Sequence, residues 1–372
     1  MHKTEAFTEL ERGVIAALET YSNVHRGSGH NSMVSTHLFE QARDIVLDYL
    51  GLSKDKYIVI FCTPRRAETL KANLKQDSYQ SVSSNDIRLS LGIKALAVKR
   101  KALPKDAPSL TGGGTTRLIS PQWVIWAKAP DKFEAGTPAI INVIAFARAL
   151  QLIRQSGDEV FPDPTAEKHS VNEILYHDEL EQIKSSGEEN PGGIAALGKA
   201  LVIVERIGLD LIREEEQALT RRILRGLSQI KGLKIYGVND PASPRFALKG
   251  GVIAYTLRGF MSDKVAKELA VRGGIGVRYG CHCAHILVKH ILGVPPPLER
   301  FQRIIASLFP RLRFPGVARV SLGIENTEED VDNFINVMGK IAAKTNTLKQ
   351  KEAERQINDF INAAAVKVYS QL

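Results

Sequence analysis

The sequence of 372 residues has no long apolar run, few cysteines and no secretion signal. No stretch of about 18 apolar residues is present, so we expect no membrane-spanning helix and no membrane partner. The first residues, MHKTEAFTELERG, lack the basic-then-apolar order of a signal peptide, which predicts a cytoplasmic protein. The three cysteines, Cys62, Cys281 and Cys283, are too few, and odd in number, for a disulfide framework.

The excess of positive charge is spread along the chain rather than concentrated. The formal net charge is +9, but lysines and arginines are mixed with acids in stretches such as KRKALPKD and REEEQALTRR. A polynucleotide site needs a concentrated basic patch. We therefore interpret the charge as a solvated basic surface and predict no nucleic-acid partner.

Hydrophobic periodicity divides the chain into helices and short strands. Helices are expected at about 5–22, 36–50 with Ser35 as its cap, 66–74, 139–155, 194–230, 262–272 and 327–343. Strands are expected at 57–62, 93–100, 123–127, 234–238, 250–257 and 318–324. This alternation predicts an α/β protein, with a mainly antiparallel sheet in its C-terminal half.

Changes in composition suggest the domain boundaries. Residues 156–193 are acidic, with glycine and proline at both ends, which indicates an inserted surface segment. We predict a first domain over 1–155, a second over 194–343 and a charged helical tail over 344–372. The segments 140–157 and 194–208 have similar apolar spacing, which we interpret as two core helices of like composition.

Four stretches together carry a family resemblance. They are NVHRG (23–27) with the helix after it, TGGG (111–114) with KFEAGTP (132–138), VRYGCHCAHIL (277–287) and ARVSLGIENTEEDVDNFI (318–335). In this order they resemble the class V aminotransferase-like, PLP-dependent family, in its cysteine desulfurase and selenocysteine lyase branch. The resemblance covers about residues 8–155 and 194–343.

The resemblance implies a PLP-transferase type I-like fold. Such a fold has a large α/β domain with a mainly parallel sheet, here in shortened form, and a smaller C-terminal α/β domain. It also implies pyridoxal 5'-phosphate (PLP) as the cofactor and a homodimer with its active site at the subunit interface. The family reaction is cleavage of a C–S or C–Se bond in a free amino acid such as cysteine.

The matching motifs assign three roles by resemblance. Cys283 stands at the position of the sulfur-accepting cysteine, and Arg319 stands at the position of the arginine that binds the substrate carboxylate. Thr137 stands at the position of the residue that reaches the phosphate of the partner subunit's PLP. A guanidinium suits a carboxylate because it donates two parallel hydrogen bonds. The plainer interpretations are an unreactive cysteine and an arginine paired with a surface acid.

The neighbouring basic residues complete the implied site. His25 and Arg26 match the HRG loop at the edge of the substrate site, and His282 stands beside the sulfur-accepting position, in contact with the cofactor. His25 and Arg26 could instead order their own loop through hydrogen bonds. A metal site in CHCAH is disfavoured, because Cys-x-Cys lacks the two-residue gap common in zinc sites.

Two departures from the family pattern concern the cofactor. In TPRRAE (63–68), Arg65 replaces the glycine and Ala67 the hydroxyl residue of the phosphate-binding turn. After Leu74 the central strands of the large domain are missing, and Asp86 occupies the position of the Schiff-base lysine. A carboxylate cannot form an internal aldimine.

The departures leave two hypotheses. In the first, the chain is an enzyme that uses PLP in a degraded site, through a neighbouring lysine such as Lys71, Lys75, Lys94 or Lys99, or in a site shared with a partner chain. In the second, PLP chemistry is impaired or lost, and the chain is a dimeric scaffold or a sulfur carrier that uses Cys283.

Overall fold

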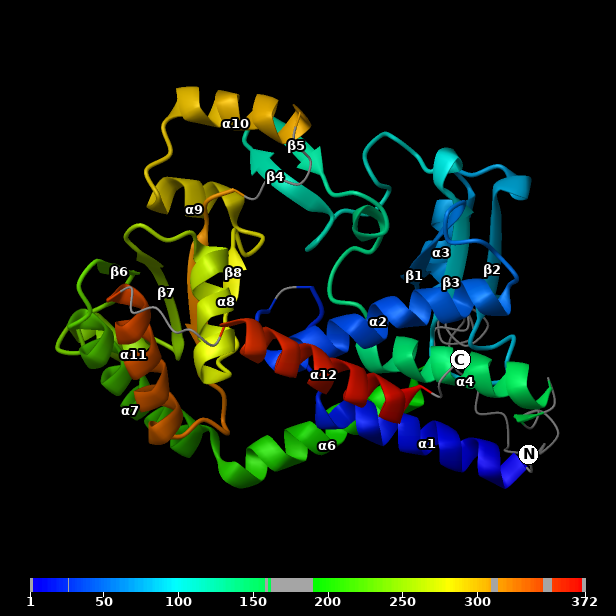
Figure 1. The fold of residues 1–372 in the computed structure, drawn as a ribbon, viewed down its shortest axis with the longest axis horizontal. Helices are drawn as coiled ribbons and strands as arrows, with labels where there is room; N and C mark the ends of the chain where they lie inside the picture. Colours follow the sequence, from blue (N-terminus) through cyan, green and yellow to red (C-terminus); the bar gives the residue numbers. More distant parts are fainter. Residues whose placement is uncertain are drawn as a thin grey trace, which may run out of the picture.

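The computed structural model describes residues 3–25, 27–157, 160–161, 190–308, 314–343 and 350–369. Helices and short sheets gather around two main apolar cores, one formed mainly by the N-terminal residues and one by residues 219–341 (Figure 1). Within the described residues, no helix is long and apolar enough to cross a membrane. The predicted α/β class is confirmed.

Helices form the first core. α1 (Lys3–Glu19), α2 (His30–Tyr49) and α4 (Ile140–Ser156) pack against one another, as their apolar spacing predicts. α2 begins earlier than expected, and Ser35 lies inside it rather than at its cap. Its hydroxyl donates to the Thr20 carbonyl at 3.0 Å and accepts from the Ser22 N–H at 2.9 Å. These tertiary hydrogen bonds hold the N-terminal part of α2 against the preceding loop.

A three-stranded sheet borders the first core. β1 (Tyr57–Cys62), β2 (Tyr79–Ser83) and β3 (Lys94–Lys99) stand in the order β1-β3-β2. β3 is antiparallel to both neighbours, so the expected mainly parallel sheet is corrected here. The reason is local, because the short connection 84–93 between β2 and β3 can join only antiparallel neighbours. α3 (Pro64–Lys71) follows β1.

A small hairpin lies between the two cores. β4 (Thr116–Ser120) and β5 (Trp123–Trp126) pair antiparallel, and β4 contacts α9 (His285–Ile291). Only β5 was expected from the sequence. α10 (Pro296–Leu308) lies beyond the hairpin (Figure 1). The side chain of Arg303 packs over Trp123. Short 3-10 turns occur at Gln76–Ser78, Arg100–Ala102, Asp131–Phe133 and Pro244–Leu248.

The second core combines a sheet with three helices. The strands β6 (Leu233–Tyr236), β7 (Val252–Leu257), β8 (Arg278–Gly280) and β9 (Val317–Ser321) stand in the order β6-β7-β9-β8, all antiparallel. α7 (Leu209–Ser228), α8 (Ser262–Gly273) and α11 (Glu328–Ala342) supply its helical side chains. The antiparallel sheet expected for this half is confirmed.

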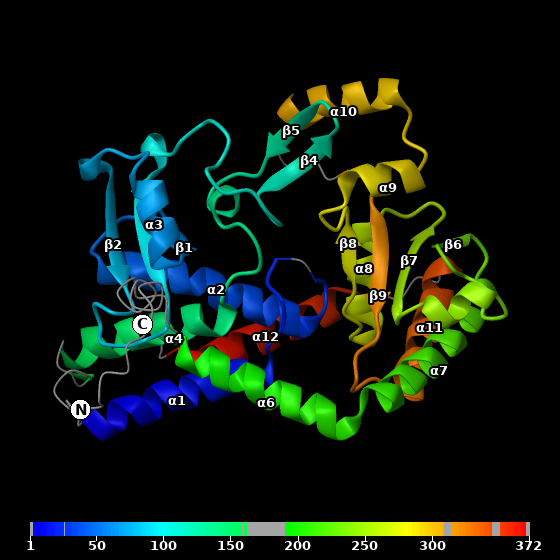
Figure 2. The same cartoon turned by 180° about the vertical axis from the view of Figure 1, so that it is seen from behind.

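Two further helices connect the cores. The expected helix 194–230 is divided into α6 (Pro191–Ile207) and α7 at Gly208, whose φ of 91° ends the first helix. The expected tail is α12 (Gln350–Val368), which returns to pack on α1 and α2 (Figure 2). The Tyr369 hydroxyl donates to the Leu38 carbonyl at 3.1 Å. Residues 162–189 of the acidic segment lie outside the described residues, and the predicted domain limits stay a prediction.

Candidate functional site

The cysteine loop lies between β8 and α9. His282 and Cys283 both have left-handed backbone, with φ of 50° and 57°. That conformation is costly for residues other than glycine, so the loop must be held by its surroundings. The Ala284 N–H donates to the Cys281 carbonyl at 2.7 Å, which closes the turn. The turn leaves Cys283 exposed, while Cys281 is partly buried.

His282 connects the loop to the sheet. Its Nε2 lies 3.0 Å from the Val317 carbonyl on β9, and because a carbonyl only accepts, Nε2 carries the proton. Burial lowers the pKa of His282; the bond to Val317 opposes this shift, and the charges of Arg319 and Arg278 reinforce it. His282 is therefore a neutral anchor of the loop. Its predicted contact with a cofactor remains a prediction.

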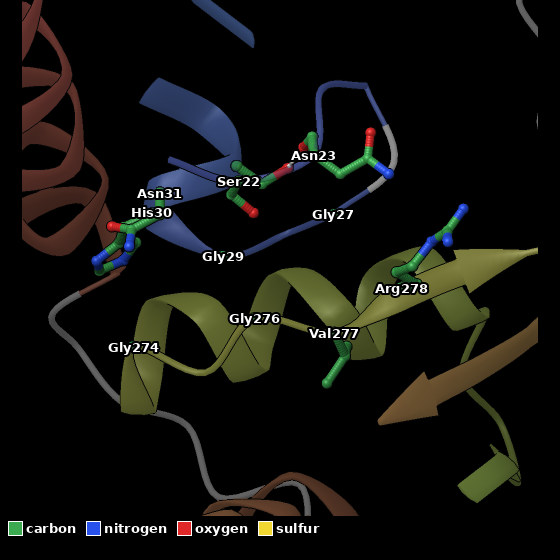
Figure 3. A pocket seen from close by; sticks show the side chains of 11 residues that line it. Ser22, Asn23, Gly27, Gly29, His30, Asn31, Gly274, Gly276, Val277 and Arg278 are labelled. Carbon is green, nitrogen blue, oxygen red and sulfur yellow. Dashed lines mark hydrogen bonds between the residues drawn. The ribbon is translucent and has the colours of Figure 1, made fainter. Parts of the chain in front are cut away.

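Two arginines face the same part of the second sheet. Arg278 on β8 and Arg319 on β9 are register partners, and the Nε atom of Arg319 is buried without a hydrogen-bond partner. A β-bridge between Gly27 and Arg278 brings the N-terminal loop beside them. Arg278 points toward the loop that carries Asn23 (Figure 3). The structure thus brings the N-terminal loop beside β8, and it joins the cysteine loop to β9 through the contact between His282 and Val317.

A cavity of about 400 Å³ lies where the N-terminal loop meets β8 (Figure 3). Its lining includes Ser22, Asn23, His30 and Arg278. The two chain segments approach closely here, because a Cβ on Gly29 would come within 2.8 Å of the Gly276 Cα. Glycine at both positions therefore allows the contact between the cores.

His25 has a different neighbour from the one that the resemblance implies. Its Nε2 lies 3.3 Å from the Glu40 carboxylate, and its ring packs edge-on against Phe39. Burial would raise the pKa of Glu40, but the hydrogen bond from His25 and the charge of Arg43 lower it to about 2. His25 thus orders its own loop against α2. Arg26 lies outside the described residues.

KFEAGTP is held by a buried ion pair. The Arg43 guanidinium donates to both carboxylate oxygens of Glu134, at 2.7 and 2.9 Å. The Phe61 N–H on β1 donates to the same carboxylate at 2.7 Å. Arg66 adds a hydrogen bond to the Ala135 carbonyl at 2.9 Å. These contacts fix the segment against α2, β1 and α3 and leave Thr137 exposed.

The turn that should bind the cofactor phosphate is closed by the protein itself. Thr63 is the N-cap of α3, and its hydroxyl accepts from the Arg66 N–H at 3.5 Å. Pro64 at the first helical position has no N–H to donate. Ala67 is fully buried and supplies no hydroxyl. This helix start offers fewer donors than a phosphate-binding turn needs.

Asp86, which the resemblance aligns with the Schiff-base lysine, has a structural role. The Asp86 carboxylate accepts from the Ser83 N–H at 2.7 Å, and the Ser83 hydroxyl accepts from the Asp86 N–H at 3.2 Å. This reciprocal pair ends β2 and begins the turn to β3. Asp86 is therefore a turn residue.

The nearest lysine is poorly suited to replace it. The Lys94 ammonium donates to Glu68 at 3.0 Å, and Glu68 also accepts from Lys71 at 2.9 Å. Burial alone would lower the pKa of Lys94, but Glu68 and the charge of Asp86 raise it above its usual value. A Schiff-base lysine must reach its neutral form. The described residues around Asp86 do not fit a lysine-bound PLP.

Sequence reasoning missed the residues that build this region. The Arg43–Glu134 pair was absent from the expected site, although the glutamate belongs to the KFEAGTP motif. The position of Glu134, shortly before Gly136 and after the expected strand 123–127, was the signal that could have pointed to a structural role for this glutamate. Among the described residues, no group of three or more histidine, cysteine or acidic side chains could hold a metal ion.

Comparisons with known proteins identify the family. The model of the aminotransferase class-V family matches residues 89–161 and 164–334, more than half of the chain. A probable cysteine desulfurase of Staphylococcus aureus (strain COL) is 28% identical over 260 residues, which cover 70% of this chain and 44% of that protein. The chain thus spans less than half the length of this curated relative.

Two solved structures show weaker likeness. The apo cysteine desulfurase of Thermococcus onnurineus NA1 is 17% identical, with a TM-score of 0.30, and the match covers 90% of this chain and 92% of that one. The cysteine desulfurase CsdA of Escherichia coli is 19% identical, with a TM-score of 0.27, and the match covers 72% and 46%. PLP is the cofactor that the family match implies. This chain belongs to the class V aminotransferase family, as a relative of the cysteine desulfurases.

Proposed function

We propose that this chain is a cysteine desulfurase-related protein that has lost lysine-bound PLP chemistry. One observation supports the proposal: Asp86, which the motif order aligns with the lysine position, has its carboxylate engaged in the turn after β2. The charged state of Lys94 and the capped start of α3 support it. In a protein of this kind, cleavage of cysteine or selenocysteine by the chain alone should be absent.

The second part of the proposal is a role as sulfur carrier through Cys283. The exposed position of this thiol supports it. In the transfer, the Cys283 thiolate attacks the outer sulfur of a persulfide donor. The S–S bond of the donor breaks, the donor leaves as a thiolate, and Cys283 becomes the persulfide. Sulfur is exchanged without any external oxidant or reductant.

The remaining features of the proposal concern assembly and location. We propose a homodimer that includes the exposed surface around Thr137, because its segment is rigidly held and projects this residue outward. We also propose a cytoplasmic location, where free cysteines persist in reduced form.

Sulfur transfer can be tested separately from cofactor binding. The purified chain is incubated with a low-molecular-weight persulfide, desalted, and analysed by peptide mass spectrometry. We expect added sulfur on the Cys283 peptide and none on the peptide of the partly buried Cys62. Cys283→Ser should abolish the added mass, and Cys281→Ser should retain it. Equal labelling of Cys62 and Cys283 would contradict a carrier role.

A further inference from the structure

α10 packs its polar side against the rest of the protein. Lys289 of α9 forms an ion pair with the Glu299 carboxylate. The guanidinium carbon of Arg303 lies 5.7 Å from the ring centroid of Trp123 on β5. The side chain of Gln302 is also covered, and this residue is only 9% exposed. The polar residues of α10 therefore hold the helix on α9 and on the β4–β5 hairpin.

The opposite side of α10 is apolar and faces away from the protein. Leu298, Phe301 and Ile304 are 44%, 56% and 58% exposed. Because residues three apart lie on the same side of a helix, these side chains form one stripe centred on Phe301, the α10 stripe. With about 100° of rotation per residue, Glu299 and Arg303 each lie roughly 160° around the helix from Phe301. The polar contacts and the stripe are thus on opposite sides of α10.

This orientation is the reverse of the usual one. A surface helix of a globular protein normally turns its apolar stripe toward the core and its polar side toward water. Both views of the molecule place α10 at its outer edge, beyond the hairpin (Figures 1 and 2). The described part of the chain leaves the α10 stripe uncovered, so its apolar side chains are available to a partner.

The surface that carries α10 has an excess of positive charge. Among the residues of β4, β5, α9 and α10, Glu299 is the only acid, whereas Arg117, Lys289, Arg300 and Arg303 are basic. Bases and acids are mixed in other stretches such as REEEQALTRR, so this local excess is not a property of the whole chain. The α10 stripe therefore lies in a basic surface, which favours a partner that is both apolar and anionic.

We propose that α10 binds the surface of an anionic lipid bilayer, with the α10 stripe in the boundary of the acyl chains and the basic residues at the level of the headgroups. Amphipathic helices that lie in the plane of a membrane surface combine apolar insertion with attraction to anionic lipids in this way. A nucleic acid would match the charge but would leave the stripe in water. A bilayer also suits a convex helix at the outer edge of a protein, because it needs no complementary groove.

This contact differs from the membrane partner that the sequence disfavoured. The absence of a long apolar run argues only against a helix that crosses the bilayer, whereas a helix in the membrane surface needs one apolar side. The proposed cytoplasmic location supplies such a surface, because the cytoplasmic leaflet carries anionic lipids. The contact uses neither Asp86 nor Cys283, so it extends beyond the proposed function and can fail independently of it.

The first experiment measures binding to vesicles. The full chain is sedimented with phosphatidylcholine vesicles with and without about one third phosphatidylserine. Ile304→Glu is compared with Ile324→Glu, the same change at a residue after β9 that is 59% exposed. We expect the parent to prefer the anionic vesicles by about fivefold or more, and to bind less at high salt. Ile304→Glu should weaken binding about tenfold or more, and Ile324→Glu should bind like the parent.

The second experiment tests which side of α10 meets the lipid. In Phe301→Trp, the added tryptophan should shift its fluorescence emission to shorter wavelength on anionic vesicles and be quenched by lipids with brominated acyl chains. A tryptophan placed by Ile324→Trp should show neither effect. Circular dichroism of all variants should match the parent, because the substituted side chains are exposed.

Four results would overturn the proposal. The first is a parent chain that does not bind anionic vesicles, and the second is equal binding to vesicles without phosphatidylserine. The third is an equal loss of binding in Ile304→Glu and Ile324→Glu. The fourth is self-association without vesicles that Ile304→Glu abolishes, because the α10 stripe would then be covered by a second copy of the chain.

Discussion

Replacement of Glu134 by alanine should destabilise the first core strongly. The side chains of Arg43 and Glu134 are only 7% and 9% exposed, and Glu134 accepts three hydrogen bonds from Arg43 and Phe61. Burial would lower the pKa of Arg43, but the carboxylates of Glu134 and Glu40 raise it above its usual range, so the guanidinium stays charged. Glu134→Ala would leave that charge buried without its main partner. We expect a loss of about 3–5 kcal/mol in the free energy of unfolding.

Two matched variants separate the loss of the buried Arg43–Glu134 pair from the loss of any carboxylate that binds a cation. Glu134→Gln keeps the shape and an acceptor for the Phe61 N–H, so its cost should be smaller, about 2 kcal/mol. Glu68→Ala removes a carboxylate that also binds two cations but is 61% exposed, and it should cost less than about 1 kcal/mol.

Hydrogen exchange of the β1 amides, combined with urea denaturation, measures the effect where it arises. The Phe61 amide should exchange much faster in Glu134→Ala than in Glu68→Ala. If both variants lose the same free energy of unfolding, the buried pair does not hold KFEAGTP against the first core, and the reasoning is refuted.

Three further predictions concern single residues. Asp86→Ala should cost about 1 kcal/mol, as for a lost cap, and Asp86→Asn clearly less, in urea denaturation. The pKa of Glu40 is lowered from 4.5 to about 2, so its stabilising effect is present above pH 4.5 and is lost as the pH falls toward 2. In Glu40→Gln, the free energy of unfolding should therefore depend less on pH between 4.5 and 2. Burial, and to a smaller extent the charge of Glu134, raises the pKa of Cys62 to about 12. Its thiolate fraction at pH 7 is on the order of 10³ lower than that of an ordinary thiol, so iodoacetamide should label Cys283 long before Cys62.

The helices could be predicted from the sequence because local spacing determines them. The apolar positions of α4 and α11 recur at helical intervals, and both helices form where expected. The start of α2 was missed because it is held by hydrogen bonds from Ser32 and Ser35 to the N-terminal loop, which have no local signature. The direction of β3 was missed because β2, whose short connection to β3 requires an antiparallel pair, was not expected as a strand.

The candidate site was predicted only in part, for a similar reason. The roles that the motifs assign to Arg319 and Cys283 stay predictions. The Arg43–Glu134 pair joins residues far apart in the sequence, and no periodicity reveals such a contact. The packing of α12 on α1 and α2 likewise depends on a return of the chain across the whole fold.

The central claim is that this chain cannot hold PLP on a lysine of its own. The most direct measurement is borohydride reduction of the purified chain with PLP, followed by an absorbance spectrum and peptide mass mapping. We predict no internal-aldimine band and no stoichiometric pyridoxyl-lysine at any position, Lys94 included. A stoichiometric pyridoxyl-lysine at one site would contradict the account.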